Sequence, residues 1–460
     1  MFGTRIVADF ERLKDLWDPA GRMNPGKIVR ANGPTDNLRL GTTYAPAKPR
    51  TFFQFPDDGG SFAHAALRCV GVGQCRRHDG GVMCPSYMVT REEKHATRGR
   101  AHLLFELMNG KELQGGWRNA EVAEALDLCL ACKGCKGDCQ VNVDMATLKA
   151  EYRAHFYARR LRPRAAYSMG LIHWWAELAA RFPRLVNAGA RAPVLARLAK
   201  QIGGIAPERT IPRFAPSTFR AWWRQRGGRW AVAAGDPTGE PDSGTRRVIL
   251  WADTFNDHFH PDAARAAVRV LEAAGCEVVV PERLLCCGRP LYDWGFLGQA
   301  RALLTTILAD LQPEIRAGTT VVGLEPSCVS VFRDEARNLL AGNHDAERLA
   351  QQTQTLTEFL AHLDGYRPPR MSGRALVHGH CHHRSVLDFE SELTVLRATG
   401  LELDVPETGC CGMAGSFGFE RGDHYAVSVA AGERALLPAV RTAAPDTWIV
   451  TGGFSCREQI

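Results

Sequence analysis

The chain has 460 residues, of which 45% are hydrophobic and 23% are charged, and its net charge is +7. A chain of this length and composition can bury a core of ordinary size, which excludes a small domain held together by disulfides. It shows no signal peptide and no run of about 18 apolar residues, so we expect a cytoplasmic protein without a membrane span. Fifteen cysteines then indicate metal or redox chemistry rather than disulfide bonding.

The first 65 residues combine a short helical pattern with turn-rich sequence. Phe10, Leu13 and Leu16 have helical spacing, and residues 18–28, with two prolines and two glycines, end that pattern. We predict that residues 1–30 are the terminal remnant of a larger domain. Residues 31–65 are rich in proline, glycine and threonine and are predicted to be a linker.

Residues 66–150 contain the densest cysteine motif, CLACKGCKGDC. Its cysteines are Cys129, Cys132, Cys135 and Cys139. Cysteines three residues apart let one loop wrap a cubane [4Fe-4S] cluster, with a fourth cysteine reaching another cluster in two-cluster ferredoxins. Structural zinc takes four ligands, usually as two separated pairs. The motif therefore favours an iron–sulfur cluster, with zinc and an unliganded loop as the alternatives.

A weaker motif precedes it, with Cys69, Cys75 and Cys84 and with Val72 where a second cysteine would stand. Exchange of fourth ligands between the two motifs predicts one complete and one deficient site. The complete site is Cys84, Cys129, Cys132 and Cys135, and the deficient site is Cys69, Cys75 and Cys139. For the deficient site the alternatives are a three-iron cluster, a fourth ligand from His78 or Asp79, an empty site, and cysteines buried as small hydrophobes.

Residues 151–246 are predicted to form a basic helical connector that ends in a linker. Residues 151–230 carry 16 Lys and Arg but 3 Asp and Glu, together with five of the ten tryptophans. Helices packed between the two cysteine-rich parts are the favoured interpretation. Docking to an anionic membrane surface is the alternative, and the scattered arginines argue against a nucleic-acid partner.

From residue 247 apolar strands alternate with helices, which predicts parallel sheets. A helix, a glycine turn, a strand and a Cys-Cys-Gly element occur twice in that order, and each copy continues to a later strand that ends near another cysteine. We therefore predict two tandem α/β modules, over residues 247–370 and 371–460. Their cysteines are Cys286, Cys287 and Cys328 in the first copy, and Cys381, Cys410, Cys411 and Cys456 in the second.

These cysteines are candidate ligands of a second metal or cluster. Adjacent cysteines do not easily form a disulfide with each other, and ligands of parallel α/β sheets collect at strand ends. The second copy adds the imidazoles of HGHCHH at 378–383, whereas the place in the first copy equivalent to Cys381 falls near Asp257. A redox-active thiol site and buried structural cysteines are the alternatives, and Cys276 is interpreted as core filler.

Several segments carry a family resemblance. GCCGMAGSFGFE, EPSC, CCGRP and GFSCREQI resemble the cysteine-rich CCG domain found in anaerobic glycerol-3-phosphate dehydrogenase and in heterodisulfide reductase. RCVGVGQCRRHDGGVMCPSY and DLCLACKGCKGDCQ are similar to the iron–sulfur half of bacterial FAD-linked oxidases of the D-2-hydroxyglutarate or D-lactate dehydrogenase type. DPAGRMNPGKI resembles the last segment of the flavin domain in those fusions.

The resemblance implies a multidomain α+β and α/β fold. A helical ferredoxin-like [4Fe-4S] domain would be followed by two CCG modules, the second shortened at its C-terminal end. In heterodisulfide reductase such modules hold non-cubane clusters with five cysteines each, and neither copy here supplies five.

The implied function is electron transfer from FAD, held in a missing domain or partner flavoprotein, through one or two [4Fe-4S] clusters to an acceptor. A membrane quinone is one candidate acceptor, which would place the chain peripherally on the inner face of the membrane. We expect no catalytic residue for the substrate here and no activity of the chain alone. A thiol–disulfide reductase module and a non-enzymatic metal-binding module are the alternatives.

Overall fold

The computed structural model describes residues 2–33, 35–36, 40–41, 44–109, 112–231 and 246–460. The chain divides into two compact units, residues 1–47 and 48–460. The first unit contains helix α1 (Gly3–Trp17), which covers the predicted helical pattern. Beyond its end, the Asp18 carboxylate accepts the backbone N–H groups of Arg22 (2.8 Å) and Met23 (2.7 Å), so the turn-rich segment is held locally.

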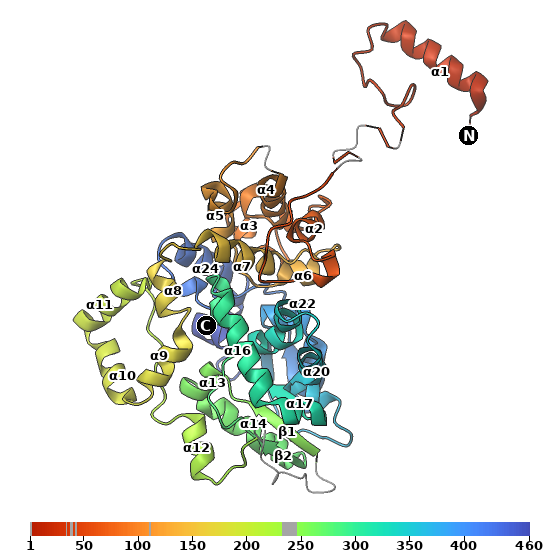
Figure 1. Ribbon diagram of the computed structural model, residues 1–460. Helices are drawn as coiled ribbons and strands as arrows, with labels where there is room; N and C mark the ends of the chain where they lie inside the picture. Colours follow the sequence, from red (N-terminus) through yellow and green to blue (C-terminus); the bar gives the residue numbers. More distant parts are fainter. Residues whose placement is uncertain (1, 34, 37–39, 42–43, 110–111, 232–245) are drawn as a thin grey trace. The chain divides into compact units, whose positions relative to one another are not determined.

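A group of short helices (Figure 1) and the loops that join them contain the first seven cysteines. The helices are α2 (Phe62–Leu67), α3 (Pro85–Thr90), α4 (Thr97–Asn109), α5 (Ala120–Asp127), α6 (Gly134–Asp138) and α7 (Met145–Phe156). The second unit begins inside the segment predicted as a linker, because Phe53 and Phe55 are buried in its core. Glu151 of α7 accepts the backbone N–H groups of Phe52 and Phe53 at 2.9 Å, which fixes this segment against the helices.

Five helices form the basic connector. They are α8 (Arg164–Ser168), α9 (Ile172–Ala179), α10 (Pro183–Arg191), α11 (Pro193–Gly203) and α12 (Phe219–Gln225). Pro183 and Pro193 occupy first-turn positions, where the missing N–H is no loss. These two prolines therefore start helices rather than interrupt them. Most of the predicted linker that follows, residues 232–245, lies outside the described residues.

The first sheet is parallel, with the order β2-β1-β3-β4. Its strands are β1 (Arg246–Trp251), β2 (Cys276–Val279), β3 (Thr320–Gly323) and β4 (Thr353–Thr355). The apolar run of β1 is buried from Val248 onward, as expected of a strand covered on both faces. The accompanying helices are α13 (Thr254–His258), α14 (Pro261–Ala273), α15 (Arg289–Asp293), α16 (Leu297–Asp310), α17 (Gln312–Ala317), α18 (Pro326–Ser330), α19 (Ala336–Leu339), α20 (His344–Gln352) and α21 (Leu356–Ala361).

The second sheet, also parallel, has the order β6-β5-β7. Its strands are β5 (Arg374–His378), β6 (Glu402–Asp404) and β7 (Trp448–Thr451), and its helices are α22 (Cys381–Val386), α23 (Phe389–Ala398), α24 (Asp423–Glu433), α25 (Leu436–Thr442) and α26 (Phe454–Gln459). In both sheets the first strand is flanked by the second and the third. This shared order is what a repeated module would produce.

The cysteine loop of the helical part packs directly on both α/β parts. A Cβ on Gly137 of α6 would lie 2.6 Å from the backbone oxygen of Ser385 in α22, so glycine allows this close approach. Lys133, whose side chain is fully buried, reaches Asp144 and Asp334 at 2.8 Å and Glu335 at 3.2 Å. Asp334 and Glu335 belong to a π-helical turn, Val331–Glu335, in the first α/β part.

None of the helices in the described part of the chain has the length and apolar character needed to cross a bilayer.

Candidate metal centres

Four cysteines of the complete predicted site surround one small cavity. Cys84, Cys129, Cys132 and Cys135 all line it. The loop gains its curvature from Ala131 and Lys133, which both have positive φ (51° and 60°). Cys84 (φ 55°) also has a left-handed backbone conformation, and it precedes Pro85 at the start of α3. The structure thus brings the cysteine of the first motif to the loop of the second.

Backbone amides donate to the sulfur atoms of two of these cysteines. The backbone N–H of Thr97 donates to Cys84 Sγ (3.1 Å), and that of Met145 donates to Cys135 Sγ (3.3 Å). Burial, with the nearby Asp144 carboxylate, raises the pKa of Cys135 well above its ordinary value. A bound cation supplies the charge that stabilises buried thiolates, and amide donors to sulfur are typical of iron–sulfur sites.

The three cysteines of the deficient site, Cys69, Cys75 and Cys139, line a second small cavity. Val72 also lines it, whereas His78 and Asp79 are not among the described residues that do. A fourth ligand from either of these two side chains therefore has no support from the geometry.

The two cavities are neighbours. Interaction with Cys84, helped by the Arg98 amide, lowers the pKa of Cys75 to about 6 against the effect of burial. The consecutive amides of Thr97 and Arg98, at the start of α4, donate to Cys84 and to Cys75 respectively. One helix end therefore positions a cysteine of each site.

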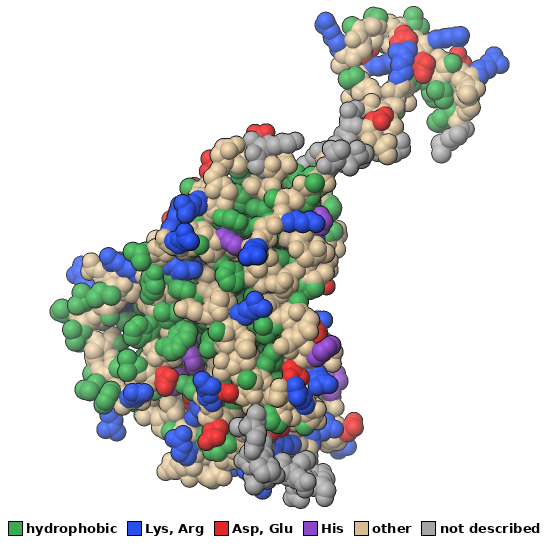
Figure 2. Space-filling view, in the orientation of Figure 1, with side chains coloured by type: hydrophobic (Ala, Val, Ile, Leu, Met, Phe, Trp, Pro, Cys, Tyr) green, Lys and Arg blue, Asp and Glu red, His purple; other side chains and the backbone are tan. Residues whose placement is uncertain are grey.

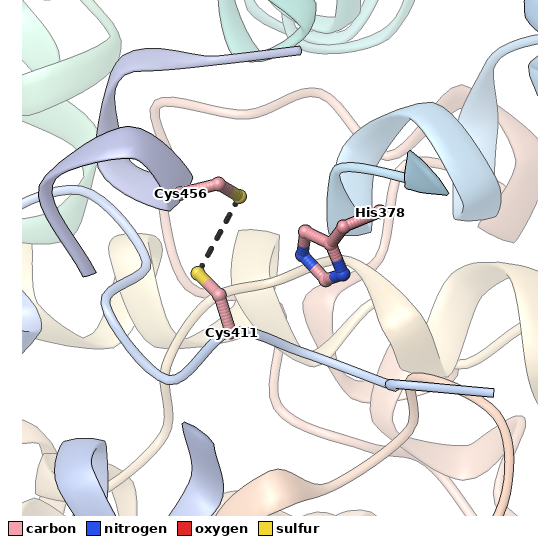
Figure 3. A group of neighbouring side chains, drawn as sticks. All are labelled: His378, Cys411 and Cys456. Atoms are coloured by element: carbon pink, nitrogen blue, oxygen red, sulfur yellow. Dashed lines mark hydrogen bonds between the residues drawn. The ribbon is translucent and has the colours of Figure 1, made fainter. Parts of the chain in front are cut away.

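The second α/β part gathers its four cysteines at the carboxyl ends of its strands. Cys411 and Cys456 have their Sγ atoms 3.4 Å apart, and Cys410 contacts Cys381 and Cys411. One ring nitrogen of His378, at the end of β5, and the Sγ atoms of Cys411 and Cys456 lie within 4.8 Å of one another (Figure 3).

Cys410 joins this group to the cubane loop, which is the segment from Cys129 to Cys139. Its thiol contacts that of Cys132, and both are buried in one cluster with Cys381 and Leu130. Thiols of three candidate centres are therefore neighbours in space, although the sequence places them in separate domains.

In the first α/β part, Cys287 and Cys328 have their Sγ atoms 3.0 Å apart. Cys286 contacts Thr254, the first residue of α13, just as Cys410 contacts Cys381, the first residue of α22. The residue equivalent to Cys381 is thus Thr254 and not the expected Asp257, which accepts the Arg220 amide at 2.9 Å. This part offers three thiols and a hydroxyl. Cys276 lies in β2 and packs in the apolar core, as expected.

A cavity of about 210 Å³ lies beside these centres. Its apolar walls come mainly from the connector and from aromatic residues of the α/β parts. The wall residues include Met169, Ile172, Ile205, Ile211, Phe214, Phe255, Phe259, Phe419 and Phe454, and Leu130 and Ala131 bring the cubane loop to its edge.

Buried polar groups line the same cavity: Arg289, Glu325, His380 and His382. Burial lowers the pKa of His380 to about 4 and raises that of Glu325, so it favours the uncharged form of both. Sequence reasoning noted the CCGRP and EPSC segments for their cysteines but missed Arg289 and Glu325. The available signal was a charged residue close to the cysteines in each segment, Arg289 in CCGRP and Glu325 in EPSC.

Two family models match the chain, a "4Fe-4S dicluster domain" over residues 65–143 and a "Cysteine-rich domain" over residues 253–333. "Lactate utilization protein A" of Bacillus velezensis is 32% identical over 181 residues, which cover 37% of this chain and 74% of that protein. The chain belongs to the iron–sulfur proteins that combine these two domains. The dicluster match spans all seven cysteines of the first two sites.

Two further members of this dicluster and cysteine-rich family align over more of the chain. "D-2-hydroxyglutarate dehydrogenase" of Pseudomonas putida is 25% identical over 492 residues, covering 98% of this chain and 47% of that enzyme. A subunit of the anaerobic glycerol-3-phosphate dehydrogenase of Escherichia coli is 27% identical over 285 residues, covering 61% and 68% respectively. The chain spans about half the length of the D-2-hydroxyglutarate dehydrogenases that it matches. No solved structure matches it.

Proposed function

We propose that this chain is the iron–sulfur electron-transfer portion of a flavin-dependent 2-hydroxyacid dehydrogenase. The observation that carries the proposal is the succession of neighbouring thiols. The consecutive amides of Thr97 and Arg98 donate to Cys84 and Cys75, and Cys132 and Cys410 are buried in one cluster, so the donor sets of three candidate centres are neighbours. Electron transfer needs such closely spaced redox groups, whereas a structural metal site does not.

In this proposal Cys84, Cys129, Cys132 and Cys135 hold a [4Fe-4S] cluster, and Cys69, Cys75 and Cys139 hold a second cluster. A bound cluster supplies one-electron chemistry. The chain's own contribution is to bury the thiolates, to exclude water and to tune their electron density with the amides of Thr97 and Met145. The FAD that takes hydride from a 2-hydroxyacid would belong to a flavoprotein domain or partner outside this chain.

We infer that the apolar cavity receives the electron acceptor. Its edge at Leu130 and Ala131 belongs to the cubane loop, so an acceptor there would be close to the proposed cluster. Apolar and aromatic walls with a few buried polar groups suit a flat, apolar carbonyl compound, which is the chemistry of a quinone. Glu325 is a buried carboxyl group that lines the cavity, and a carboxyl group can relay the protons that quinone reduction needs.

The thiol–disulfide alternative is less well supported. Exchange requires an accessible thiolate, and Cys411, whose pKa is held well below its ordinary value by Cys410 and Cys456, is only 2% exposed. Cys456 is completely buried. These thiols are placed as ligands are, facing one another inside the protein.

Anaerobic mixing with reduced FAD tests the proposal. We expect the protein to oxidise added reduced FAD while its visible cluster absorbance bleaches, and a water-soluble quinone to restore the absorbance. Electron uptake should fit one electron per cluster, because each cluster is a one-electron carrier. Protein that contains iron and sulfide but takes no electrons from reduced FAD, or gives none to the quinone, would contradict the function while leaving the clusters in place.

The connector presents a surface suited to a membrane. Helices α9, α10 and α11 form a lobe at the side of the second unit, and apolar side chains gather on it with Lys and Arg nearby (Figure 2). Its exposed apolar residues are Trp174, Trp175, Leu178, Phe182, Leu185, Val194, Leu195, Leu198 and Ile202. We propose that this apolar face lies on an anionic bilayer, because an amphipathic basic helix favours that surface and the same connector lines the proposed quinone cavity.

Replacing Leu185 and Leu198 together by aspartate should abolish sedimentation with phosphatidylglycerol vesicles. Both side chains are exposed, at 72% and 50%, so the change adds charge to the apolar face without disturbing the core. Leu161→Asp, at an 88% exposed position outside this lobe, is the matched control and should sediment like the unaltered protein. Failure of the unaltered protein to bind these vesicles at low salt would refute membrane docking.

A further inference from the structure

His378 has the surroundings of a metal ligand. It ends β5 beside Thr451, the last residue of β7, and is completely buried. Its Nδ1 is 2.6 Å from the Thr408 hydroxyl, whereas its Nε2 is buried without a hydrogen-bond partner. Burying an unpaired polar atom is costly, so the side of the ring that Nε2 faces is where a partner would bind.

The groups that face this position are thiols. Figure 3 shows the imidazole of His378 turned toward the side chains of Cys411 and Cys456, and the three ligand atoms lie within 4.8 Å of one another. We propose that His378 is a metal ligand in the second α/β part, and that its Nε2 completes a mixed imidazole–thiolate centre with Cys411 and Cys456. Cys410, which neighbours Cys411, and Cys381, which neighbours Cys410, can supply further thiolates.

The contact with Thr408 supports this assignment. With Nδ1–H donating to the Thr408 hydroxyl, the lone pair is on Nε2, on the side of the two thiols. Histidines that bind metals commonly donate their other ring N–H in this way, which fixes the ring and its tautomer. Thr408 is itself buried, so the ring is held in place before any metal binds.

Two of the neighbouring histidines of HGHCHH have other partners close to both ring nitrogens. His382 has Nδ1 2.8 Å from Ser330 Oγ and Nε2 3.3 Å from the Ala131 oxygen. His383 has Nδ1 2.9 Å from the Glu392 carboxylate and Nε2 3.0 Å from the Asp388 oxygen. Among the described residues, neither side chain belongs to the group of ligand atoms formed by His378, Cys411 and Cys456.

The centre would belong to the second α/β part alone. In the first part, the residue equivalent to His378 is Trp251, because β1 ends at Trp251 as β5 ends at His378. An indole nitrogen has no lone pair to give a metal. The ligand set of the second part, soft thiolate with borderline imidazole, suits iron or zinc. If the metal is iron, exchanging a thiolate for a neutral imidazole raises the reduction potential.

Pulsed electron paramagnetic resonance on anaerobically purified protein labelled with ¹⁵N-histidine tests this proposal. We expect a histidine ¹⁵N coupling to a reduced iron centre. If the second part instead contains zinc, exchange with Co²⁺ should give a cobalt centre with the same nitrogen coupling. His378→Cys should keep the metal, because it supplies a thiolate, and should lose the coupling.

His378→Gln should lose the coupling together with the metal of this centre, whereas His383→Gln, a buried histidine of the same motif, should keep both. The proposal would be overturned if the coupling survived in both His378 variants, or if unaltered protein with metal in the second part showed no coupling. Neither outcome depends on the flavin partner or on electron transfer, so the proposed function can fail while this centre stands.

Discussion

Cys132→Ala is expected to remove the cubane cluster and to slow electron uptake from reduced FAD by at least about 100-fold. Loss of a mere supporting residue around a metal costs about 10–100-fold in affinity or activity, and Cys132 is proposed as a direct ligand. Cys132 is also buried in one cluster with Cys410, so the same change removes one of the contacts between the helical part and the second α/β part.

Iron per chain and the rate of flavin oxidation are the two measurements. Cys276→Ala is the matched control, because Cys276 is equally buried, at 6% exposed against 7% for Cys132, but packs in the apolar core of the first sheet. The control should keep its iron and its rate. Full iron and sulfide in Cys132→Ala would show that the cluster does not use this thiol.

Lys133→Met is expected to lower the free energy of unfolding by about 3–5 kcal/mol, the usual cost of leaving buried charge uncompensated. Burial opposes the charge of Lys133, but Asp144, Asp334 and Glu335 outweigh it and raise its pKa. Without the ammonium group these carboxylates lose their central counter-charge, and only Lys136, which also bonds Asp334, and Arg289, which pairs with Glu335 at 2.7 Å, remain.

Denaturant unfolding under anaerobic conditions measures this loss. Lys94→Met is the control, since Lys94 forms an exposed pair with Glu124 at 2.8 Å and exposed pairs contribute little. A Lys133 variant as stable as the Lys94 variant would mean that the helical part and the first α/β part do not depend on this buried cluster for their packing.

The grouping of the first seven cysteines could be predicted from the sequence, because ligand spacing along one loop is a local property. Cys84 was assigned to the loop of Cys129 by the exchange of ligands between motifs, and the structure places it there. The contact of Cys132 with Cys410 could not be predicted, since it joins segments that only the packing of α6 on α22 brings together.

Other differences have similar physical causes. Residues around Phe53, which were predicted to be a linker, belong to the second unit. The Phe53 side chain is buried in the core, and the Phe53 backbone N–H donates to Glu151, far along the chain. The place equivalent to Cys381 could be put only near Asp257, three residues after Thr254, because sequence comparison without strand ends leaves the register open by about one helical turn. The sequence pointed to all four histidines of HGHCHH as possible ligands but could not single out His378, because only the structure shows which ring nitrogen faces the thiols of Cys411 and Cys456.

Metal and sulfide analysis of anaerobically purified protein, combined with electron paramagnetic resonance after dithionite reduction, decides whether the cysteine loop holds an iron–sulfur cluster. We predict iron with a matching amount of acid-labile sulfide, enough for at least one four-iron cluster per chain, and a signal from a reduced cluster that disappears in Cys132→Ala. Zinc without sulfide, or protein free of metal, would refute the cluster and with it the proposed electron transfer.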